Sequence, residues 1–563
     1  MKKLRWQLLI IFLTGLVVGI LLLGEQPEAA SPQATPVPVQ GGVYTEALIG
    51  SMMRLNPLLN IYNPPDREVT RLIFSGLLRF DSNGVPEPDL AASWGYTQDG
   101  TIYNITLRED AQWHDGEPVV ADDVLFTVDL LRNGSDIVPV DLQDFWSDIE
   151  VVKLSDQVLQ FRLPEAFAPF PDYLTFGILP KHLLDGNSID EMIDLNFNLQ
   201  PVGSGPYQFA SLELDGDEIV GVSLAAFEDY YGTKPYIDEI VFRYYPDSFA
   251  AMDAYKDGLV QGIGGVSADI LPEALAEPDL AIFSARQPEL SMILFNLQNR
   301  DVEFLQEVEV RTALLTGLNR QAIVDRIFKG QAVIADGPIL PGTWSYYDKL
   351  KRVEFDPETA RTQLRDAGYT FETEGDQVRK KDEVPLAFEL LYPDDDLHQA
   401  VAELIQSNWQ ALGVDVTLTP APYESLIYDR LELRDYQAAL IDLNLSRLPD
   451  PDPYPFWDQA QAAGGQNYTQ WDNRVASEYL EQARVTVNLA ERAKFYRNFQ
   501  IIFTQELPAL PLYYPVYTYA VDREVQGVRV GPIFDTSDRF ANVTEWFLVE
   551  QANQEVAAPA SNP

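Results

Sequence analysis

The chain of 563 residues contains no cysteine, which excludes disulfide bonds, thiolate catalysis and a lipid attached to an N-terminal cysteine. Histidine is almost as scarce, and the three residues His114, His182 and His398 lie far apart in the sequence. His114 with Glu117 is a pairing that could hold a metal, but its place in the tight turn 113–116 favours a structural role. We therefore expect no metal site and no cofactor.

Sequence motifs of common enzymes are also missing. The chain has no G-x-S-x-G nucleophile turn, no phosphate-binding G-x-x-x-x-G-K-S/T loop, no H-E-x-x-H zinc motif and no G-x-G-x-x-G dinucleotide motif. Carboxylates are abundant, so a glycosidase using an acid pair stays open on sequence grounds. We expect a protein that is not an enzyme, with a secreted polysaccharide hydrolase as the alternative.

Basic residues are outnumbered by acidic ones, 40 against 86, which gives a formal net charge of -46. A field of this sign repels phosphates, so binding to nucleic acid is excluded as a function. The hydrophobic content of 46% and the aromatic content of 11% exclude a disordered chain. The length exceeds what one hydrophobic core usually organises and indicates two or three domains.

The N-terminus carries an export signal. A basic start, Met1 to Arg5, precedes an uncharged apolar run at 8–23. As a helix this run is about 24 Å long, and the residues before Ala29 and Ala30 make a poor cleavage site. We expect residues 1–24 to be an uncleaved signal anchor, followed by a proline-rich linker at 25–40 and an exported remainder.

Hydrophobic periodicity predicts interleaved helices and strands without an internal repeat, which indicates an α/β fold. Alternation predicts strands at 103–107, 158–163, 237–244 and 414–418. Helical spacing predicts helices at 121–131 and 397–412. Asn319, Asn473 and Asn488 are each placed to cap the start of a further helix, and Gly330 is placed to end the first of these.

The segment 72–131 carries a series of short motifs in a fixed order. It reads GLL at 76–78, LAASW at 90–94, DG at 99–100, LR at 107–108, WHDG at 113–116 and ADDV at 121–124. In this wording the chain resembles the family-5 extracytoplasmic solute-binding proteins of ABC importers, which bind dipeptides, oligopeptides or nickel. Further matching blocks, such as PVGSGPY at 201–207 and ELPALPLYY at 506–514, extend the resemblance over residues 41–548. Val120 departs from the family, which commonly has threonine there.

The resemblance implies a two-lobed fold of the periplasmic-binding-protein type II, in its large three-domain variant, with a hinge and a ligand cleft between the lobes. The domains it implies are a discontinuous lobe 1 core at 41–57, 201–286 and 511–550, an additional lobe 1 subdomain at 58–200, lobe 2 at 287–510, and a disordered tail at 551–563. The glycines at 203 and 205 suit a sharp chain reversal between the first two parts.

The resemblance also indicates ligand-binding residues in lobe 2. In peptide-binding members an aspartate after a Gly-Trp pair contacts the α-amino group of the ligand. In this chain Asp442 or Asp450 could take that place, although the tryptophan is missing and the spacing differs, so a proline-stiffened surface loop is the alternative. The ligand-binding candidates are Trp344, Asp442, Asn444, Asp450, Trp457 and Asn296. For Trp344 the alternative is packing between loops, and for Asn296 it is capping of backbone groups.

We therefore expect a receptor outside the cytoplasmic membrane that closes on a small solute and delivers it to the permease subunits of an ABC importer. We expect a peptide as solute, with an oligosaccharide or a metal chelate as alternatives. The membrane contact is expected through the N-terminal anchor. A chemosensory adaptor without a transport partner is the remaining alternative.

Overall fold

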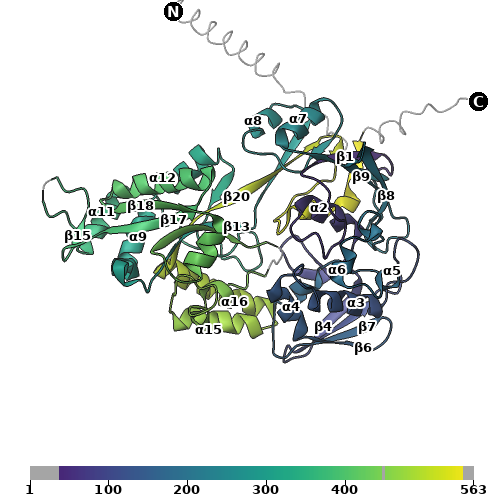
Figure 1. Cartoon of the computed structure of the whole chain (residues 1–563), viewed down its shortest axis with the longest axis horizontal. Coiled ribbons are helices and arrows are strands. Elements are labelled where there is room, and N and C mark those ends of the chain that lie inside the picture. The colour runs from purple at the N-terminus through teal and green to yellow at the C-terminus, as the bar shows by residue number, and fades with distance from the viewer. Residues whose placement is uncertain (1–36, 374, 447–449, 550–563) are drawn as a thin grey trace, which may run out of the picture.

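Two lobes make up the computed structural model of the chain, which describes residues 37–373, 375–446 and 450–549 (Figure 1). The hydrophobic core of lobe 1 is built from residues between 44 and 280 and between 517 and 548. The core of lobe 2 is built mainly from residues between 290 and 514. Each lobe combines helices with strands, so the expected α/β class is confirmed. The finer domain boundaries stay a prediction.

Within the described residues no helix has the length and apolar character needed to cross a bilayer. The expected anchor at 1–24, most of the linker at 25–40 and the expected tail at 551–563 lie outside the described residues.

A twelve-stranded sheet runs through both lobes. Its strands follow one another in the order β18 (Asp415–Ala421), β17 (Ala387–Pro393), β19 (Ala438–Asn444), β13 (Glu289–Phe295), β20 (Ala509–Asp522), β11 (Gly262–Ile263), β1 (Val43–Ile49), β10 (Glu239–Tyr245), β9 (Glu218–Ala226) and β8 (Tyr207–Asp215). The strands β12 (Leu280–Arg286) and β14 (Ala332–Ile334) also pair with β20. The sheet therefore connects the two lobes through β20.

Strand β20 belongs to both lobes. Its first half pairs with β13 and β14 of lobe 2, and its second half pairs with β11 and β12 of lobe 1. The chain crosses between the lobes a second time at Gln287 and Pro288, where the Gln287 amide donates to the Pro515 carbonyl over 2.8 Å. We call Gln287, Pro288, Pro515 and Val516 the hinge. Proline cannot donate a ladder hydrogen bond, so both prolines weaken strand pairing where the lobes meet.

The subdomain of lobe 1 that follows α2 (Pro64–Ile73) is organised around a four-stranded antiparallel sheet. The order is β4 (Ala91–Tyr96), β5 (Ile102–Leu107), β7 (Val158–Arg162) and β6 (Glu150–Lys153). The helices α3 (Ala121–Arg132) and α4 (Val140–Ser147) lie beside it (Figure 1). Alternation at 103–107 and helical spacing at 121–131 predicted β5 and α3 correctly. The Asp123 carboxylate accepts from the Val120 amide over 2.9 Å, and the Asp123 amide, which a threonine hydroxyl at position 120 would cap, donates to the Val120 carbonyl over 3.0 Å.

The capping residues expected in lobe 2 are confirmed. The Asn319 side chain accepts from the Ala322 amide, the Asn473 side chain from the Ala476 amide, and the Asn488 side chain from the Glu491 amide. They open α10 (Arg320–Ala322), α15 (Arg474–Val485) and α16 (Leu489–Glu506). The first is shorter than expected, because α10 continues as the π-helical turn η4 (Ile323–Ile327). The remaining long helices of this lobe are α9 (Val308–Thr316), α11 (Pro357–Asp366) and α12 (Asp396–Gln410).

Glycine is needed at positions 203 and 205 because the backbone of another segment lies too close for a side chain. Neither has a positive φ, so neither makes a reversal that requires glycine. A Cβ atom on Gly203 would lie 1.9 Å from the Ile73 carbonyl oxygen, and one on Gly205 would lie 2.3 Å from the Leu72 carbonyl oxygen. These glycines therefore let the segment pass directly against the end of α2, and the sharp reversal stays a prediction.

A buried ion cluster joins the two ends of lobe 1. The Arg539 guanidinium is fully buried and donates to the Glu46 carboxylate of β1 over 2.9 Å and to the Glu68 carboxylate of α2 over 2.6 Å. The Tyr519 hydroxyl donates to the same Glu46 carboxylate over 3.0 Å. One cation thus neutralises two buried carboxylates from segments almost 500 residues away in sequence.

We predict that Arg539→Met destabilises the protein by about 3–5 kcal/mol, because it leaves Glu46 and Glu68 buried without a counter-charge. The measurement is denaturant unfolding followed by tryptophan fluorescence. Arg529→Met is the matched control, since the Arg529 side chain pairs with Glu545 at the exposed surface and should contribute less than about 1 kcal/mol. Equal unfolding midpoints for the two variants would contradict the prediction.

Candidate functional site

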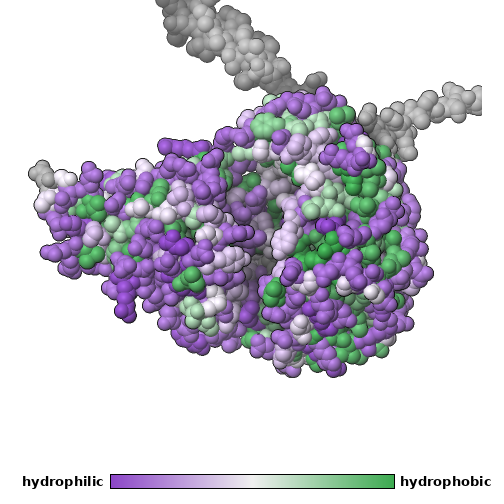
Figure 2. Space-filling model, in the orientation of Figure 1, coloured by the Kyte–Doolittle hydropathy of each residue, from purple (hydrophilic) through white to green (hydrophobic). Residues whose placement is uncertain are grey.

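The surface is hollowed between the two lobes (Figure 2), and a cavity of about 710 Å³ lies in this region. Most of its walls come from lobe 1: the segment 57–74, helix α4, the segment 163–177 and the segment 534–538. Ser446 and Arg484 reach it from lobe 2. A cavity of this size, lined by both lobes, suits a small organic ligand.

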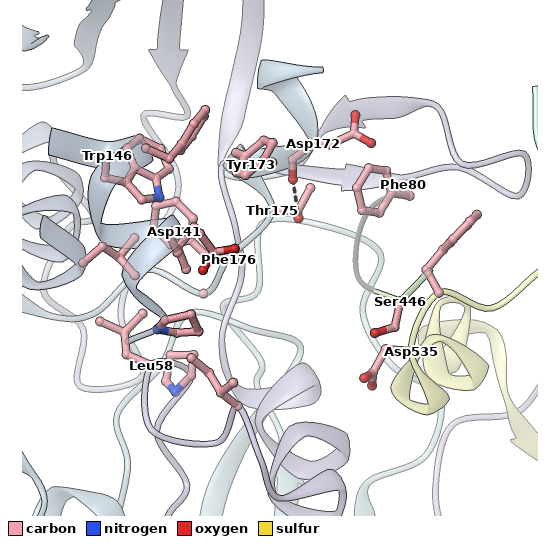
Figure 3. Close-up of a pocket in the computed structure, with 18 of the residues that line it drawn as sticks. Leu58, Phe80, Asp141, Trp146, Asp172, Tyr173, Thr175, Phe176, Ser446 and Asp535 are labelled. Atoms are coloured by element: carbon pink, nitrogen blue, oxygen red, sulfur yellow. Dashed lines mark hydrogen bonds between the residues drawn. The ribbon is translucent and has the colours of Figure 1, made fainter. Parts of the chain in front are cut away.

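Aromatic side chains form one wall of this cavity, which is larger than a second one beside the hinge and is called the larger cavity below. Phe145 of α4 stacks on Tyr173 at a ring-centroid distance of 4.1 Å, and Trp146 packs edge-on against Phe176 at 5.5 Å. Figure 3 shows Trp146, Tyr173 and Phe176 on one side of the cavity, with Phe80, Ser446 and Asp535 facing them across it. Such walls favour a ligand with apolar or aromatic parts.

The basic side chains of the larger cavity are already paired. The Arg67 guanidinium of α2 donates to the Asp535 carboxylate over 2.8 Å, and Arg71 lies 4.0 Å from Asp538. Burial acts to raise the pKa of Asp535, but the charge of Arg67 and hydrogen bonds from Ser537 outweigh burial and lower it. These arginines are therefore neutralised by the protein and are not free to bind an anionic ligand.

The lobes touch beside this cavity through a buried ion cluster. The Asp450 carboxylate of lobe 2 is paired with Arg492 and accepts from the Tyr496 hydroxyl over 2.9 Å. The Asp450 amide donates to the Asp172 carboxylate of lobe 1 over 2.7 Å, and Arg492 donates to the Ala168 carbonyl of lobe 1 over 3.2 Å. Burial and the neighbouring Asp450 carboxylate raise the pKa of Asp172 well above its usual value. The described arrangement is therefore one in which the lobes are in contact.

Trp344 lies at the same contact. Its ring packs on Tyr496 at 5.6 Å and under the Arg492 guanidinium at 5.1 Å, and its amide donates to the Asn83 carbonyl of lobe 1 over 3.3 Å. The structure thus brings together two of the six candidates, Trp344 and Asp450. Neither lines the larger cavity.

Asp442 lies elsewhere, at a second cavity of about 390 Å³ beside the hinge. Its carboxylate binds the His398 imidazole over 2.9 Å, and the other nitrogen of His398 binds the Asp395 carboxylate over 2.6 Å. Burial acts to lower the pKa of His398, but Asp442 and Asp395 together outweigh it and raise the pKa. The raised pKa favours the charged form of the imidazole, in which both ring nitrogens donate to carboxylates.

The other three candidates have partners within lobe 2. Asn444 ends β19 and accepts from the Ser446 amide over 2.8 Å. Asn296 donates to the Arg434 and Tyr436 carbonyls over 2.9 and 3.1 Å, which is the capping role foreseen as the alternative. Trp457 is buried and packs edge-on against Phe503 at 4.8 Å. Ligand binding by any of the six candidates stays a prediction.

His114 has the structural role expected for it. Its Nδ1 accepts from the Gly203 amide over 3.1 Å, and its Nε2 lies 3.1 Å from the Gly205 carbonyl oxygen. Burial lowers the pKa of His114 to about 4, so the ring is neutral at physiological pH. Both ring nitrogens are occupied by backbone groups and neither is available to a metal.

The sequence analysis missed the residues that line the larger cavity. Its aromatic wall comes from two short runs, DFW at 144–146 and FAPFPDYLTF at 167–176. Both are rich in large aromatic residues and lack a regular helical or strand period. That combination was the available signal, because a regular period would have assigned these side chains to a core.

Comparison of the sequence with known proteins finds one family and several relatives. The sequence profile described as bacterial extracellular solute-binding proteins, family 5 middle, matches residues 85–466. The dipeptide-binding protein of Escherichia coli K12 is 27% identical over 474 residues, which cover 79% of this chain and 84% of the relative. The oligopeptide-binding protein AppA of Bacillus subtilis is 24% identical over 535 residues, which cover 93% and 95%.

Solved structures match over nearly the whole chain. NikZ from Campylobacter jejuni, in complex with Ni(L-His), superposes with a TM-score of 0.66 at 28% identity, over 90% of this chain and 99% of NikZ. AppA in complex with a nonapeptide superposes with a TM-score of 0.65 at 24% identity, over 91% of this chain and all of AppA. The solutes of these relatives differ, so similarity alone does not select one for this chain.

We predict that Asp172→Asn strengthens the contact between the lobes at neutral pH. Because the folded-state pKa of Asp172 is raised, this carboxyl costs stability as pH rises above its unfolded value of about 3.9. Asparagine keeps an oxygen that can accept from the Asp450 amide but loses the repulsion between carboxylates. The melting temperature of the variant should exceed that of the wild type at about pH 8 and approach it at about pH 3. A gain of the same size at both pH values would contradict this explanation.

Proposed function

Since the chain belongs to the bacterial extracellular solute-binding proteins of family 5, we propose that it captures a peptide-class solute in the cavity between its lobes and delivers it to an ABC permease. As a member of this family it is a binding protein and not an enzyme, so the hydrolase alternative is discarded. The observation that carries the proposal is the cavity of about 710 Å³, which both lobes line next to their point of contact.

The energetics of the cavity support capture by closure. A ligand that touches Tyr173 of lobe 1 and Ser446 of lobe 2 makes its full set of contacts only when the lobes are together. Its affinity for the closed arrangement therefore exceeds that for an open one, and binding shifts the population toward closure. A permease that recognises the closed arrangement can thus distinguish loaded from empty receptor.

A peptide is our first choice of solute for two reasons. The stacked rings of Phe145 and Tyr173 offer an apolar surface to a side chain, while polar groups such as Thr175 and Ser446 lie within the same cavity. The related dipeptide-binding protein and AppA are named for peptides. Nickel and haem, for which other relatives are named, remain outcomes of the test.

Mass spectrometry of solute that co-purifies with the native protein tests the proposal directly. Release of a peptide by denaturation supports it, and release of a metal chelate or of haem keeps the receptor function but changes the solute. Uptake of the labelled solute by cells should then require this protein. Unimpaired uptake in its absence would leave a sensory adaptor as the better description.

We predict that Phe145→Ala weakens binding of the solute identified in this way by about 1.5–3 kcal/mol, the value of burying one large apolar side chain. Isothermal calorimetry measures the change. Phe249→Ala removes the same side chain from an exposed position of helix α7 (Ser248–Lys256) and should leave the affinity unchanged. Equal affinities of both variants would place the solute outside this cavity.

We further propose that the receptor stays attached to the membrane by residues 1–24, because the cleavage context at Ala29 and Ala30 is poor. The intact mass of protein extracted from native membranes should include Met1 or begin at Lys2. A population that begins uniformly between Pro27 and Ala34 would show that the segment is a cleaved signal peptide.

A further inference from the structure

Asp172 is a buried carboxyl group in the wall of the larger cavity (Figure 3). It belongs to the short 3-10 helix η1 (Phe170–Leu174) of lobe 1 and is 4% exposed. Its backbone is fixed on both sides, because its amide donates to the Pro169 carbonyl over 3.0 Å and its carbonyl accepts from the Thr175 hydroxyl over 2.9 Å. The carboxyl group therefore has a defined position in the cavity wall.

The two oxygens of this carboxyl group differ in their contacts. Oδ2 accepts from the Asp450 amide of lobe 2 over 2.7 Å, as part of the contact between the lobes. Oδ1 has no hydrogen-bond partner in the part of the chain that the structure describes. Since Asp172 lines the cavity, Oδ1 is the oxygen left for a molecule inside it. Polar atoms at buried positions almost always have a partner, so Oδ1 indicates a group that the solute supplies.

Among the described residues, no cation is bonded to Asp172. The Arg492 guanidinium is paired with Asp450 and donates its other hydrogen bonds to a tyrosine hydroxyl and to backbone carbonyls. Arg484 is paired with Asp452 over 2.8 Å. Three carboxylates therefore meet two guanidinium groups where the lobes touch. The surplus carboxylate is that of Asp172, because the other two are paired.

A surplus carboxylate at a buried position is neutralised by taking up a proton. Burial and the neighbouring Asp450 carboxylate raise the pKa of Asp172, and the charge of Arg492 opposes them. In the neutral form Oδ2 still accepts from the Asp450 amide, so the proton resides on Oδ1. The cavity wall then presents a hydrogen-bond donor. The titratable and charged groups of this cluster are Asp172, Tyr173, Asp450, Asp452, Arg484, Arg492 and Tyr496.

We propose that Asp172, as a neutral carboxylic acid, donates a hydrogen bond from Oδ1 to a carbonyl oxygen of the solute. This inference rests on the proposed function and specifies the chemistry that the cavity selects. A peptide backbone offers such carbonyl oxygens. An anionic oxygen is a poorer partner, because Asp141, Asp148 and Glu165 line the same cavity without an ion pair among the described residues. A cationic group would instead require the ionised form of Asp172.

The dependence of affinity on pH distinguishes these partners. When the lobes separate, Asp172 loses its burial and the contact with Asp450, so its pKa returns toward the ordinary value of about 3.9. Capture of a solute brings the lobes together and therefore takes up a proton at any pH between the ordinary and the raised pKa. Affinity is then highest at low pH and falls by up to about tenfold per pH unit as pH rises through this interval. A cationic partner gives the opposite slope.

The test measures how much of a synthetic peptide library the immobilised full-length protein retains between about pH 5 and pH 7. The library contains peptides of about two to five residues built from alanine, serine and phenylalanine, which fit a cavity of this size. Their terminal groups keep their charges in this interval, because the α-carboxyl pKa is about 3.5 and the α-amino pKa about 8. Mass spectrometry quantifies the retained peptides. Retention by the wild type should fall as pH rises.

Three variants separate the donor from a packing effect. Asp172→Asn keeps an oxygen for the Asp450 amide and an N–H donor for the solute at every pH, so it should retain peptide without the fall seen in the wild type. Asp172→Leu has a similar size but no donor, and it should bind about three- to tenfold more weakly than Asp172→Asn at every pH. Asp144→Asn, on the exposed side of α4 and outside the cavity, is the matched control and should keep the pH dependence of the wild type.

Wild-type affinity that rises with pH and is lost in Asp172→Asn would overturn the proposal in favour of a cationic partner. Wild-type binding that is independent of pH, or equal binding by the asparagine and leucine variants, would also overturn it.

If thermal melts show that Asp172→Leu does not fold, the infrared band of a neutral carboxylic acid decides instead. The peptide-loaded wild type at about pH 7 should have this band at an intensity that Asp172→Asn loses and Asp144→Asn keeps, and identical spectra would refute the neutral donor. All of these negative results leave peptide capture intact. If no library peptide is retained at any pH, the proposed capture of peptides itself fails, and this inference fails with it.

Discussion

The sharing of β20 between the lobes is the constraint on which the rest of the structure depends. Because one strand is hydrogen-bonded to β13 and β14 on one side of Pro515 and to β11 and β12 on the other, neither lobe can move without bending it. Relative motion is concentrated at the hinge, where the prolines remove ladder hydrogen bonds. The smaller cavity lies at this bend, and the larger one lies where the lobes meet. A ligand in either cavity thus acts on the same movement.

Several buried arginines of this protein are paired with carboxylates, whereas carboxylates without a partner line the cavities. Ion pairs with carboxylates of the protein neutralise Arg539, Arg67 and Arg492. These pairs hold segments of the fold together, and the three charges are not available to a ligand. The carboxylates without partners, such as Glu289, line the cavities instead. Acidic residues outnumber basic ones, so many carboxylates have no basic partner in the protein. Many of these carboxylates are exposed to solvent or line the cavities.

Local signals in the sequence predicted local structure well. Helix α3, strand β5 and the caps at Asn473 and Asn488 follow from periodicity and from side chains that bond within four residues. The site was harder to predict because its residues are defined by distant partners. Asp442 and Asp450 look alike in the sequence, yet one binds His398 at the hinge and the other binds Arg492 at the lobe contact. Likewise, no sequence pattern separates Phe145, which faces a cavity, from Phe503, which is buried in a core.

The ion cluster of Arg539 has a consequence for how the chain matures during secretion. Glu46 and Glu68 lie near the start of the chain, but the buried cation that pairs with both, Arg539, lies almost 500 residues later. The aromatic residues Phe540 and Trp546, which complete the same core, arrive with it. The residues of the lobe 2 core, from 290 to 514 with Phe534, therefore precede in the chain the last residues that the lobe 1 core needs. Chains that lack the last 25 residues also lack Arg539, so the core of lobe 1 stays incomplete in them. Extracytoplasmic proteases should therefore degrade such chains.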